Sequence, residues 1–148
     1  MDISRTTQST PLQFCLALAR ASASLSRRFD GRLGTWHGIS LGDLAILLEL
    51  RDAADGRLRR VDLAERLGVT ASGVTRALIP LEKIGLVTRK ADTSDARVSF
   101  AALTAAGRRR LEEALESAHL IGEEIVPGSH DACMDVFDRI AGRDRPRP

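Results

Sequence analysis

The segment Val61–Phe100 reads VDLAERLGVTASGVTRALIPLEKIGLVTRKADTSDARVSF, a pattern that predicts a helix, a tight turn, a second helix and a two-stranded hairpin. Gly68 is the residue type that tolerates the left-handed conformation after a helix, so the first helix is predicted to end there. Thr70 can cap the second helix. Apolar residues at three- and four-residue steps predict one buried stripe on that second helix, formed by Val74, Ala77, Leu78, Leu81 and Ile84.

The opposite face of the second helix is polar or cationic, with Ser72, Thr75, Arg76 and Lys83. Two helices joined by a short turn, the second polar on its outer side, suit the major groove of B-DNA. We therefore predict that Ser72, Thr75 and Arg76 meet base edges and phosphates, with Arg76 able to bind guanine bidentately. Gly73 would let the helix approach the duplex closely. The alternative is the solvated face of an ordinary amphipathic helix.

The predicted wing is a hairpin with a polar tip. Its strands are expected over Leu86–Lys90 and Arg97–Leu103. Asp95 and Arg97 are two residues apart and would share one side of a strand, so that Asp95 holds the Arg97 guanidinium toward the minor groove. A weak surface ion pair is the alternative. Arg89 and Lys90 flank the tip as candidate phosphate contacts. Upstream, three arginines offer either further phosphate contacts or a solvated turn: Arg57, Arg59 and Arg60.

Pro80 interrupts the second helix of this unit. A proline inside a helix removes one hydrogen bond and crowds the carbonyl of Arg76. The helix is therefore expected either to kink at Pro80 or to be shortened there, with the reading end left intact.

The segments around this unit are predicted to be helical. A helix over Pro11–Phe29, with a near-heptad apolar seam, is expected to end at Asp30-Gly31, before a glycine-rich loop that carries the only Trp. Ser40 is expected to cap the next helix, and Thr104 a long one. We assign residues 1–10 to a flexible N-terminus, 11–30 and 104–142 to a helical dimerisation region, 40–103 to a winged helix-turn-helix, and 143–148 to a flexible tail. The fold class is mainly α with a small β-wing.

The seams of the terminal helices have no obvious partner within a small winged helix. We expect them to pack across a two-fold axis in a homodimer. Such a dimer reads pseudo-palindromic half-sites about one helical turn apart, roughly 34 Å.

Composition excludes several other classes of protein. The 148 residues suit one domain with helical extensions, and a net charge of only +2 means that any DNA-binding basicity is local. The absence of Tyr disfavours single-strand or RNA binding, which uses aromatic stacking. No apolar run reaches the length of a membrane span and no signal-peptide core is visible, so a cytoplasmic protein is expected. The sequence contains neither a phosphate-binding loop nor a nucleophile motif, either of which would indicate an enzyme, and it implies no cofactor.

The segments DLAERLGVTASGVTRALIPLEKIGLVTRKADTSDAR and LTAAGRRRL resemble the MarR family of bacterial transcriptional regulators, and the resemblance extends from about Leu12 to Ile140. It implies a homodimer, usually a repressor, released from double-stranded DNA by a small phenolic or other aromatic ligand, or by oxidation. The positions that match the family's DNA-reading sites are Ser72, Thr75, Arg76, Asp95 and Arg97. Pro80 departs from the usual family pattern.

The resemblance leaves the trigger open. A ligand pocket would lie between the dimerisation helices and the winged helix, where Trp36 and His37 would contribute, although Trp36 could instead be a core anchor. Cys15 and Cys133 would form a thiol-sensing pair across a dimer. Both lie on apolar stripes, which favours buried structural thiols, and the peroxide-sensing branch uses tyrosines that this chain lacks. The histidines and cysteines do not have metal-ligand spacing. A winged helix that serves as a protein-interaction or architectural module is the remaining alternative.

Overall fold

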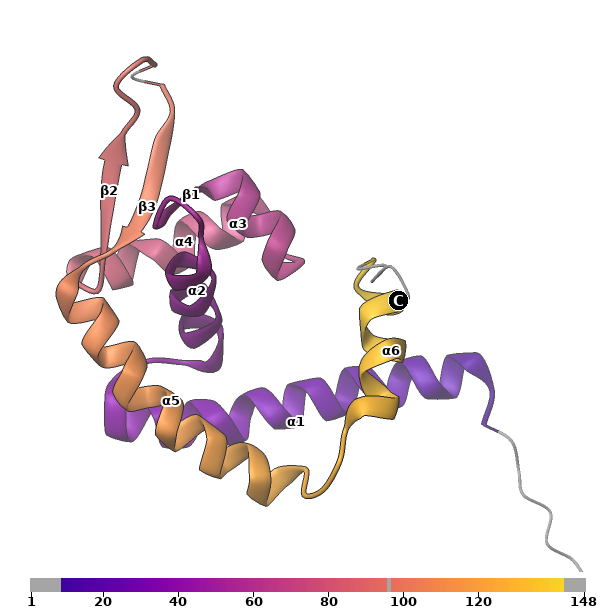
Figure 1. Cartoon of the computed structure of the whole chain (residues 1–148). Helices are drawn as coiled ribbons and strands as arrows, with labels where there is room; N and C mark the ends of the chain where they lie inside the picture. Colours follow the sequence, from indigo (N-terminus) through magenta and orange to yellow (C-terminus); the bar gives the residue numbers. More distant parts are fainter. Residues whose placement is uncertain (1–8, 96, 143–148) are drawn as a thin grey trace, which may run out of the picture.

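A computed structural model describes residues 9–95 and 97–142 of the chain. Within these residues, helices and a small sheet follow the order α1 Pro11–His37, α2 Leu41–Asp52, β1 Arg57–Arg59, α3 Arg60–Leu67, α4 Ala71–Lys83, β2 Val87–Ala91, β3 Ser99–Leu103, α5 Ala105–Ile125 and α6 Asp131–Ile140 (Figure 1). The predicted winged helix-turn-helix is confirmed. The flexible termini predicted for 1–10 and 143–148 fall mostly outside the described residues.

The sheet is antiparallel, with strand order β1-β3-β2. Leu58 pairs with Ala101, and Val87 with Leu103, so β3 is the central strand. The hairpin of β2 and β3 projects from the helical body as the wing (Figure 1). Because β3 begins at Ser99, the prediction that Arg97 lies on a strand is wrong: Asp95 and Arg97 belong to the tip.

Helix α1 is longer than predicted. It passes through Asp30-Gly31 and Gly34 and ends at His37, with Gly38 left-handed at φ 67°. The loop expected around Trp36 is therefore helix. Two glycines cost a helix only about 1 kcal/mol each, and the burial of Phe29 and Leu33 outweighs this penalty. Asp30 does not end α1; its carboxylate accepts a hydrogen bond from the Leu41 N–H at 2.7 Å and so ties α1 to the start of α2.

The core joins the winged helix to α5. Its fully buried side chains come from α1, α2, α3, α4 and α5, and include Leu33, Leu47, Leu50, Leu63, Leu81, Leu111 and Ile121. Ser40 and Thr104 cap α2 and α5 as predicted. The Thr104 hydroxyl also donates to the Gly85 carbonyl at 2.6 Å, and its backbone N–H donates to the Leu86 carbonyl at 3.1 Å. Gly107 packs against that same carbonyl. The root of the wing is thus fastened to the start of α5.

The two ends of the chain expose apolar side chains. Helix α6 buries none of its residues. Large exposed side chains on it and on the first two turns of α1 are Leu12, Phe14, Leu16, Met134, Phe137 and Ile140. No helix in the described part of the chain combines the length and apolar character that crossing a membrane requires.

Candidate nucleic-acid interface

Helices α3 and α4 form the helix-turn-helix as the sequence predicts. Gly68 ends α3 in the left-handed conformation, with φ 66°. The Thr70 hydroxyl accepts a hydrogen bond from the Gly73 N–H at 3.1 Å and caps α4. Val74 and Leu78 bury the inner side of α4. This anchoring fixes which side of α4 faces outward.

The outward side of α4 carries Ser72 and Arg76, both exposed. The Ser72 hydroxyl lies 3.3 Å from the Thr70 hydroxyl. The Arg76 guanidinium has no hydrogen bond or ion pair with the described residues. Its five donors are therefore available to an external acceptor.

Two predicted contact residues lie away from this outward side. Gly73 is half-buried and lines a cavity toward α2, so its position does not favour the expected close approach to a duplex. Thr75 is also half-buried. Its hydroxyl donates to the Ala71 carbonyl at 3.0 Å and accepts from Arg60 Nη1 at 3.4 Å. Thr75 thus connects α4 to the start of α3, and Arg60 is the residue that holds it.

Helix α4 continues through Pro80 to Lys83. Shortening at Pro80, one of the two predicted outcomes, is therefore wrong. The C-terminal turn is completed beyond the proline, where the Pro80 carbonyl accepts the Ile84 N–H at 3.0 Å. A change of helix direction at Pro80 stays a prediction.

The tip of the wing is organised by two aspartates. Asp92 Oδ1 accepts from the Ser94 N–H at 2.7 Å and from the Ser94 hydroxyl at 2.6 Å, and these bonds hold the pKa of Asp92 below its usual range. Asp95 Oδ1 accepts from the backbone N–H of Arg97 at 2.9 Å. The expected Asp95–Arg97 side-chain pair is not formed among the described atoms: Asp95 shapes the backbone and leaves the exposed Arg97 guanidinium unpaired there.

The remaining basic residues near the wing differ in their availability. Arg89 lies 3.6 Å from Glu82 of α4, which ties β2 to that helix, whereas Lys90 is exposed without an ion pair in the described chain. Arg57 stacks on Phe100 at 4.3 Å. Arg59 binds Asp62 through two bonds of 2.8 and 3.0 Å, and these bonds lower the pKa of Asp62. Arg57, Arg59 and Arg60 are therefore engaged within the chain, which favours a structural role.

His37 joins the end of α1 to α5, and Trp36 precedes it in α1. Trp36 is 52% exposed, so a core anchor is ruled out in this chain; the Arg32 guanidinium lies 4.9 Å from its ring and is paired with Glu124 at 2.5 Å. His37 Nε2 lies 2.8 Å from the Ser117 hydroxyl. The His37 carbonyl accepts a hydrogen bond from Arg110 of α5.

Cys15 and Cys133 are both free and exposed. The expectation of buried thiols is wrong for the single chain, because the apolar stripes on which they lie face outward. The described residues contain no group of three or more potential ligands that could hold a metal ion.

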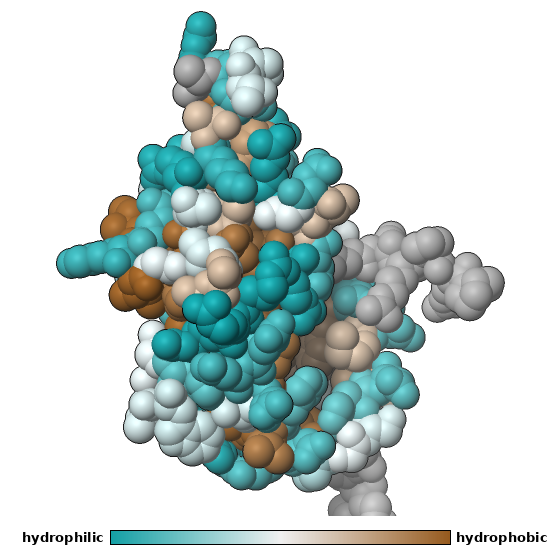
Figure 2. All heavy atoms as spheres, turned by 60° about the vertical axis from the view of Figure 1, so that its left-hand side comes forward, coloured by the Kyte–Doolittle hydropathy of each residue, from teal (hydrophilic) through white to brown (hydrophobic). Residues whose placement is uncertain are grey.

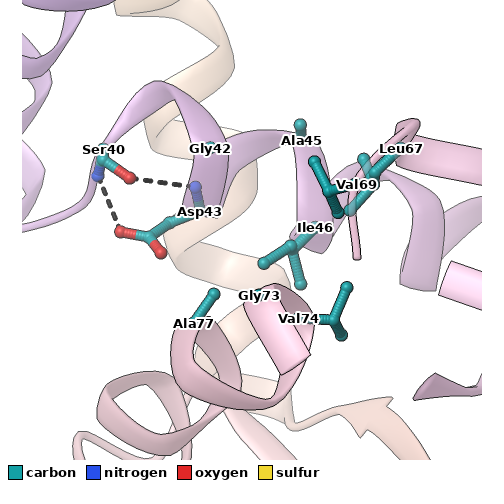
Figure 3. A pocket seen from close by; sticks show the side chains of 10 residues that line it. All are labelled: Ser40, Gly42, Asp43, Ala45, Ile46, Leu67, Val69, Gly73, Val74 and Ala77. Carbon is teal, nitrogen blue, oxygen red and sulfur yellow. Dashed lines mark hydrogen bonds between the residues drawn. The ribbon is translucent and has the colours of Figure 1, made fainter. Parts of the chain in front are cut away.

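A cavity of about 330 Å³ separates the start of α2 from α4. Its lining is mostly apolar and comprises Ser40, Gly42, Asp43, Ala45, Ile46, Leu67, Val69, Gly73, Val74 and Ala77 (Figure 3). Ile46 of α2 lies across the cavity from Val74 and Ala77 of α4 (Figure 3). Ser40 and Asp43 bond to each other at the rim, at 2.8 and 3.0 Å. Trp36 and His37 do not line this cavity. The sequence did not predict it, and the small residues that face each other on α2 and α4 are the only sequence signal for it.

The fold and this surface define the class of winged helix-turn-helix proteins, whose second helix and wing face outward together. Proteins of known family with similar sequences belong to the same class. Residues 39–99 match the model of the MarR family. The chain is 34% identical over 105 residues to the HTH-type transcriptional repressor YetL of Bacillus subtilis (strain 168), covering 71% of this chain and 63% of YetL. It spans less than two thirds of the curated relatives that it matches.

Solved structures show the same fold. The transcriptional regulator BldR from Sulfolobus solfataricus superposes with a TM-score of 0.79 at 29% identity, covering 90% of this chain and 95% of BldR. Sco3205, a MarR family regulator from Streptomyces coelicolor solved in complex with DNA, superposes with a TM-score of 0.79 at 23% identity. The match covers 93% of this chain and 91% of Sco3205. The similarity to the MarR family model therefore lies in residues 39–99, and the likeness to solved structures extends the shared fold over most of the chain.

Proposed function

We propose that this protein is a sequence-specific transcriptional regulator that binds double-stranded DNA. It acts as a homodimer on a pseudo-palindromic operator, as a repressor that a small-molecule effector releases. The observation that carries the proposal is the outward side of α4, where Arg76 is exposed without a partner among the described residues and the opposite side is buried.

What distinguishes Arg76 is its place: it is exposed on the outward side of the second helix of a helix-turn-helix. Several arginines elsewhere on the surface lie beside a carboxylate, as Arg51 does at 2.7 Å from Asp52 and Arg59 at 2.8 Å from Asp62. An unpaired guanidinium can instead bind guanine O6 and N7 bidentately in the major groove, which is worth about 1–3 kcal/mol of base discrimination. The exposed guanidinium of Arg97 at the wing tip supports a second contact, in the adjacent minor groove.

The exposed apolar ends support a homodimer. Apolar side chains on α6 and on the first turns of α1 have no cover within the described chain. A second copy would bury them and hold two recognition helices at a fixed spacing. The DNA complex of the similarly folded Sco3205 supports DNA binding, and the name of the relative YetL supports the repressor role.

The cavity between α2 and α4 supports release by an effector. Its volume of about 330 Å³ suits a small aromatic molecule such as a phenol. A ligand there would touch Ile46 on one side and Val74 and Ala77 on the other. It would therefore change the angle between α2 and the recognition helix, which a DNA half-site requires to be fixed.

The test is fluorescence anisotropy with the upstream intergenic DNA of the gene. Wild type is expected to bind in the nanomolar range, with affinity that falls as salt rises. Arg76→Ala and Arg97→Ala are each expected to weaken binding about 10- to 100-fold. The matched control is Arg51→Ala, which removes an exposed arginine at the end of α2, outside both the DNA-facing surface and the dimerisation region. If Arg76→Ala and Arg97→Ala bind like Arg51→Ala, the proposed DNA readout is refuted and an interaction module becomes the better interpretation.

Thiol oxidation is a second candidate trigger, favoured by the exposure of both Cys15 and Cys133. Non-reducing electrophoresis after peroxide treatment tests it. A crosslinked dimer that both Cys15→Ser and Cys133→Ser abolish would support a sensing pair. Absence of the crosslinked species would eliminate it and leave the ligand as the trigger.

A further inference from the structure

The outward side of α4 contains one large aliphatic side chain. Ile79 is 55% exposed. At about 100° of rotation per residue, Ser72, Arg76, Ile79 and Lys83 fall within about 60° of each other on the helix surface. Ile79 thus lies in the middle of the surface assigned to DNA, one turn beyond Arg76 and one turn before Lys83.

Packing within the chain does not explain Ile79. The buried side of α4 is complete without it, because Val74, Leu78 and Leu81 are each no more than 2% exposed. Helix α4 packs against α3 and β2, beside the wing, whereas the exposed apolar residues of α6 lie across the molecule (Figure 1). In the space-filling view, hydrophobic side chains emerge in separate patches between hydrophilic ones (Figure 2). The surface proposed for dimerisation would therefore leave Ile79 uncovered.

We propose that Ile79 is a specificity-determining residue, which packs against the 5-methyl group of a thymine beside the guanine bound by Arg76. This inference rests on the proposed DNA-binding function. Thymine is the one base that presents a methyl group in the major groove. Ile79 is three residues from Arg76, about 4.5 Å along the helix axis. That rise corresponds to between one and two base-pair steps of about 3.4 Å.

The side-chain chemistry suits this role. Isoleucine is branched at Cβ and holds one strongly preferred rotamer in a helix, so little conformational entropy is lost when it meets a methyl group. Arg76 and Lys83 on either side would bind a base edge and a phosphate, which holds Ile79 against the floor of the groove. The outward surface then reads two neighbouring base pairs, one by hydrogen bonds and one by apolar contact.

The first experiment is in vitro selection from a random duplex library with the full chain, Ile79→Ala and Ile84→Ala. Ile84 is the matched control, since it is 54% exposed but lies about 140° around the helix from Ile79. Wild type and Ile84→Ala are expected to select a T·A pair within two base pairs of a conserved guanine. Ile79→Ala is expected to lose the preference at that pair alone.

The second experiment removes only the methyl group. Replacing the selected thymine by deoxyuridine is expected to weaken wild-type binding about three- to fivefold and to leave Ile79→Ala unchanged. An unchanged motif for Ile79→Ala, or equal wild-type affinity for both duplexes, overturns the inference while the regulator proposal stands. If wild type selects no motif at all, the proposed function itself fails. Circular dichroism of Ile79→Ala checks that the exposed substitution leaves the fold intact.

Discussion

Gly107 fixes the distance between the wing and α5, and replacing it with alanine is the sharpest test of the fold. A Cβ atom at this position would lie 2.0 Å from the Leu86 carbonyl oxygen and 2.9 Å from its carbonyl carbon, whereas real Cβ contacts essentially never fall below 3.0 Å. The obstacle is backbone and cannot rotate away. The start of α5 must therefore move off the root of the wing by about 1 Å.

That movement costs both packing and hydrogen bonds. Overpacking of this kind typically costs about 1–3 kcal/mol, and weakening the Thr104 cap adds about 1 kcal/mol. Alanine's better helix propensity returns about 1 kcal/mol. The free energy of unfolding should therefore fall by about 1–3 kcal/mol, which lowers the Tm of a chain of this length by roughly 3–12 °C.

The assay is thermal and urea unfolding followed by circular dichroism, at one fixed protein concentration because a dimer's stability depends on it. Gly122→Ala is the matched control in the same helix, since its added Cβ would meet only Phe29 Cζ at 4.0 Å. Gly122→Ala is expected to be neutral or slightly stabilising. If Gly107→Ala were as stable as Gly122→Ala, the close approach to Leu86 would not be a constraint.

Three further outcomes are expected. The hydrogen bonds from Arg59 lower the pKa of Asp62 in the folded protein. Their small contribution to stability is therefore complete above the unfolded pKa of about 3.9 and is lost as the pH falls through the folded pKa. In acid unfolding, the difference in stability between wild type and Asp62→Asn should close. Phe137→Glu should put a charge into the proposed dimer surface and give a monomer by light scattering; a persistent dimer would locate the interface elsewhere. Ala45→Leu should fill the cavity, keep DNA affinity within about threefold, and abolish release by small phenols in anisotropy; retained release would move the effector site.

The helix-turn-helix could be predicted because its determinants are local. Gly68 and Thr70 mark the turn by their own backbone chemistry, and the apolar spacing of α4 fixes its buried side. The outward position of Arg76 followed from that spacing. The outward position of Ile79 follows from the same spacing, but the sequence prediction considered only polar side chains as DNA contacts.

The errors came where distant packing decides. The helix-breaking tendency of Gly31 is local, whereas the burial of Leu33 that carries α1 onward is tertiary. Cys15 lies on an apolar stripe whose cover is not within the described chain, so apolar periodicity wrongly suggested burial. Trp36 is 52% exposed, although large aromatic side chains mostly pack. Asp95 and Arg97 were expected to share one side of a strand because the start of β3 could not be located from alternation. The cavity depends on the separation of α2 from α4, which no single segment encodes.

The unpaired state of Arg76 has a consequence for how induction would work. No internal ion pair of the described chain masks this guanidinium, so an effector in the cavity would have no charge to hide; it could only misalign α4. The induced protein should keep its salt-sensitive attraction to any duplex and lose its preference for the operator. On a genome, where non-specific sites outnumber operators by about a million or more, such a loss of discrimination is enough to vacate the promoter. Induction would then turn a selective binder into an indiscriminate one.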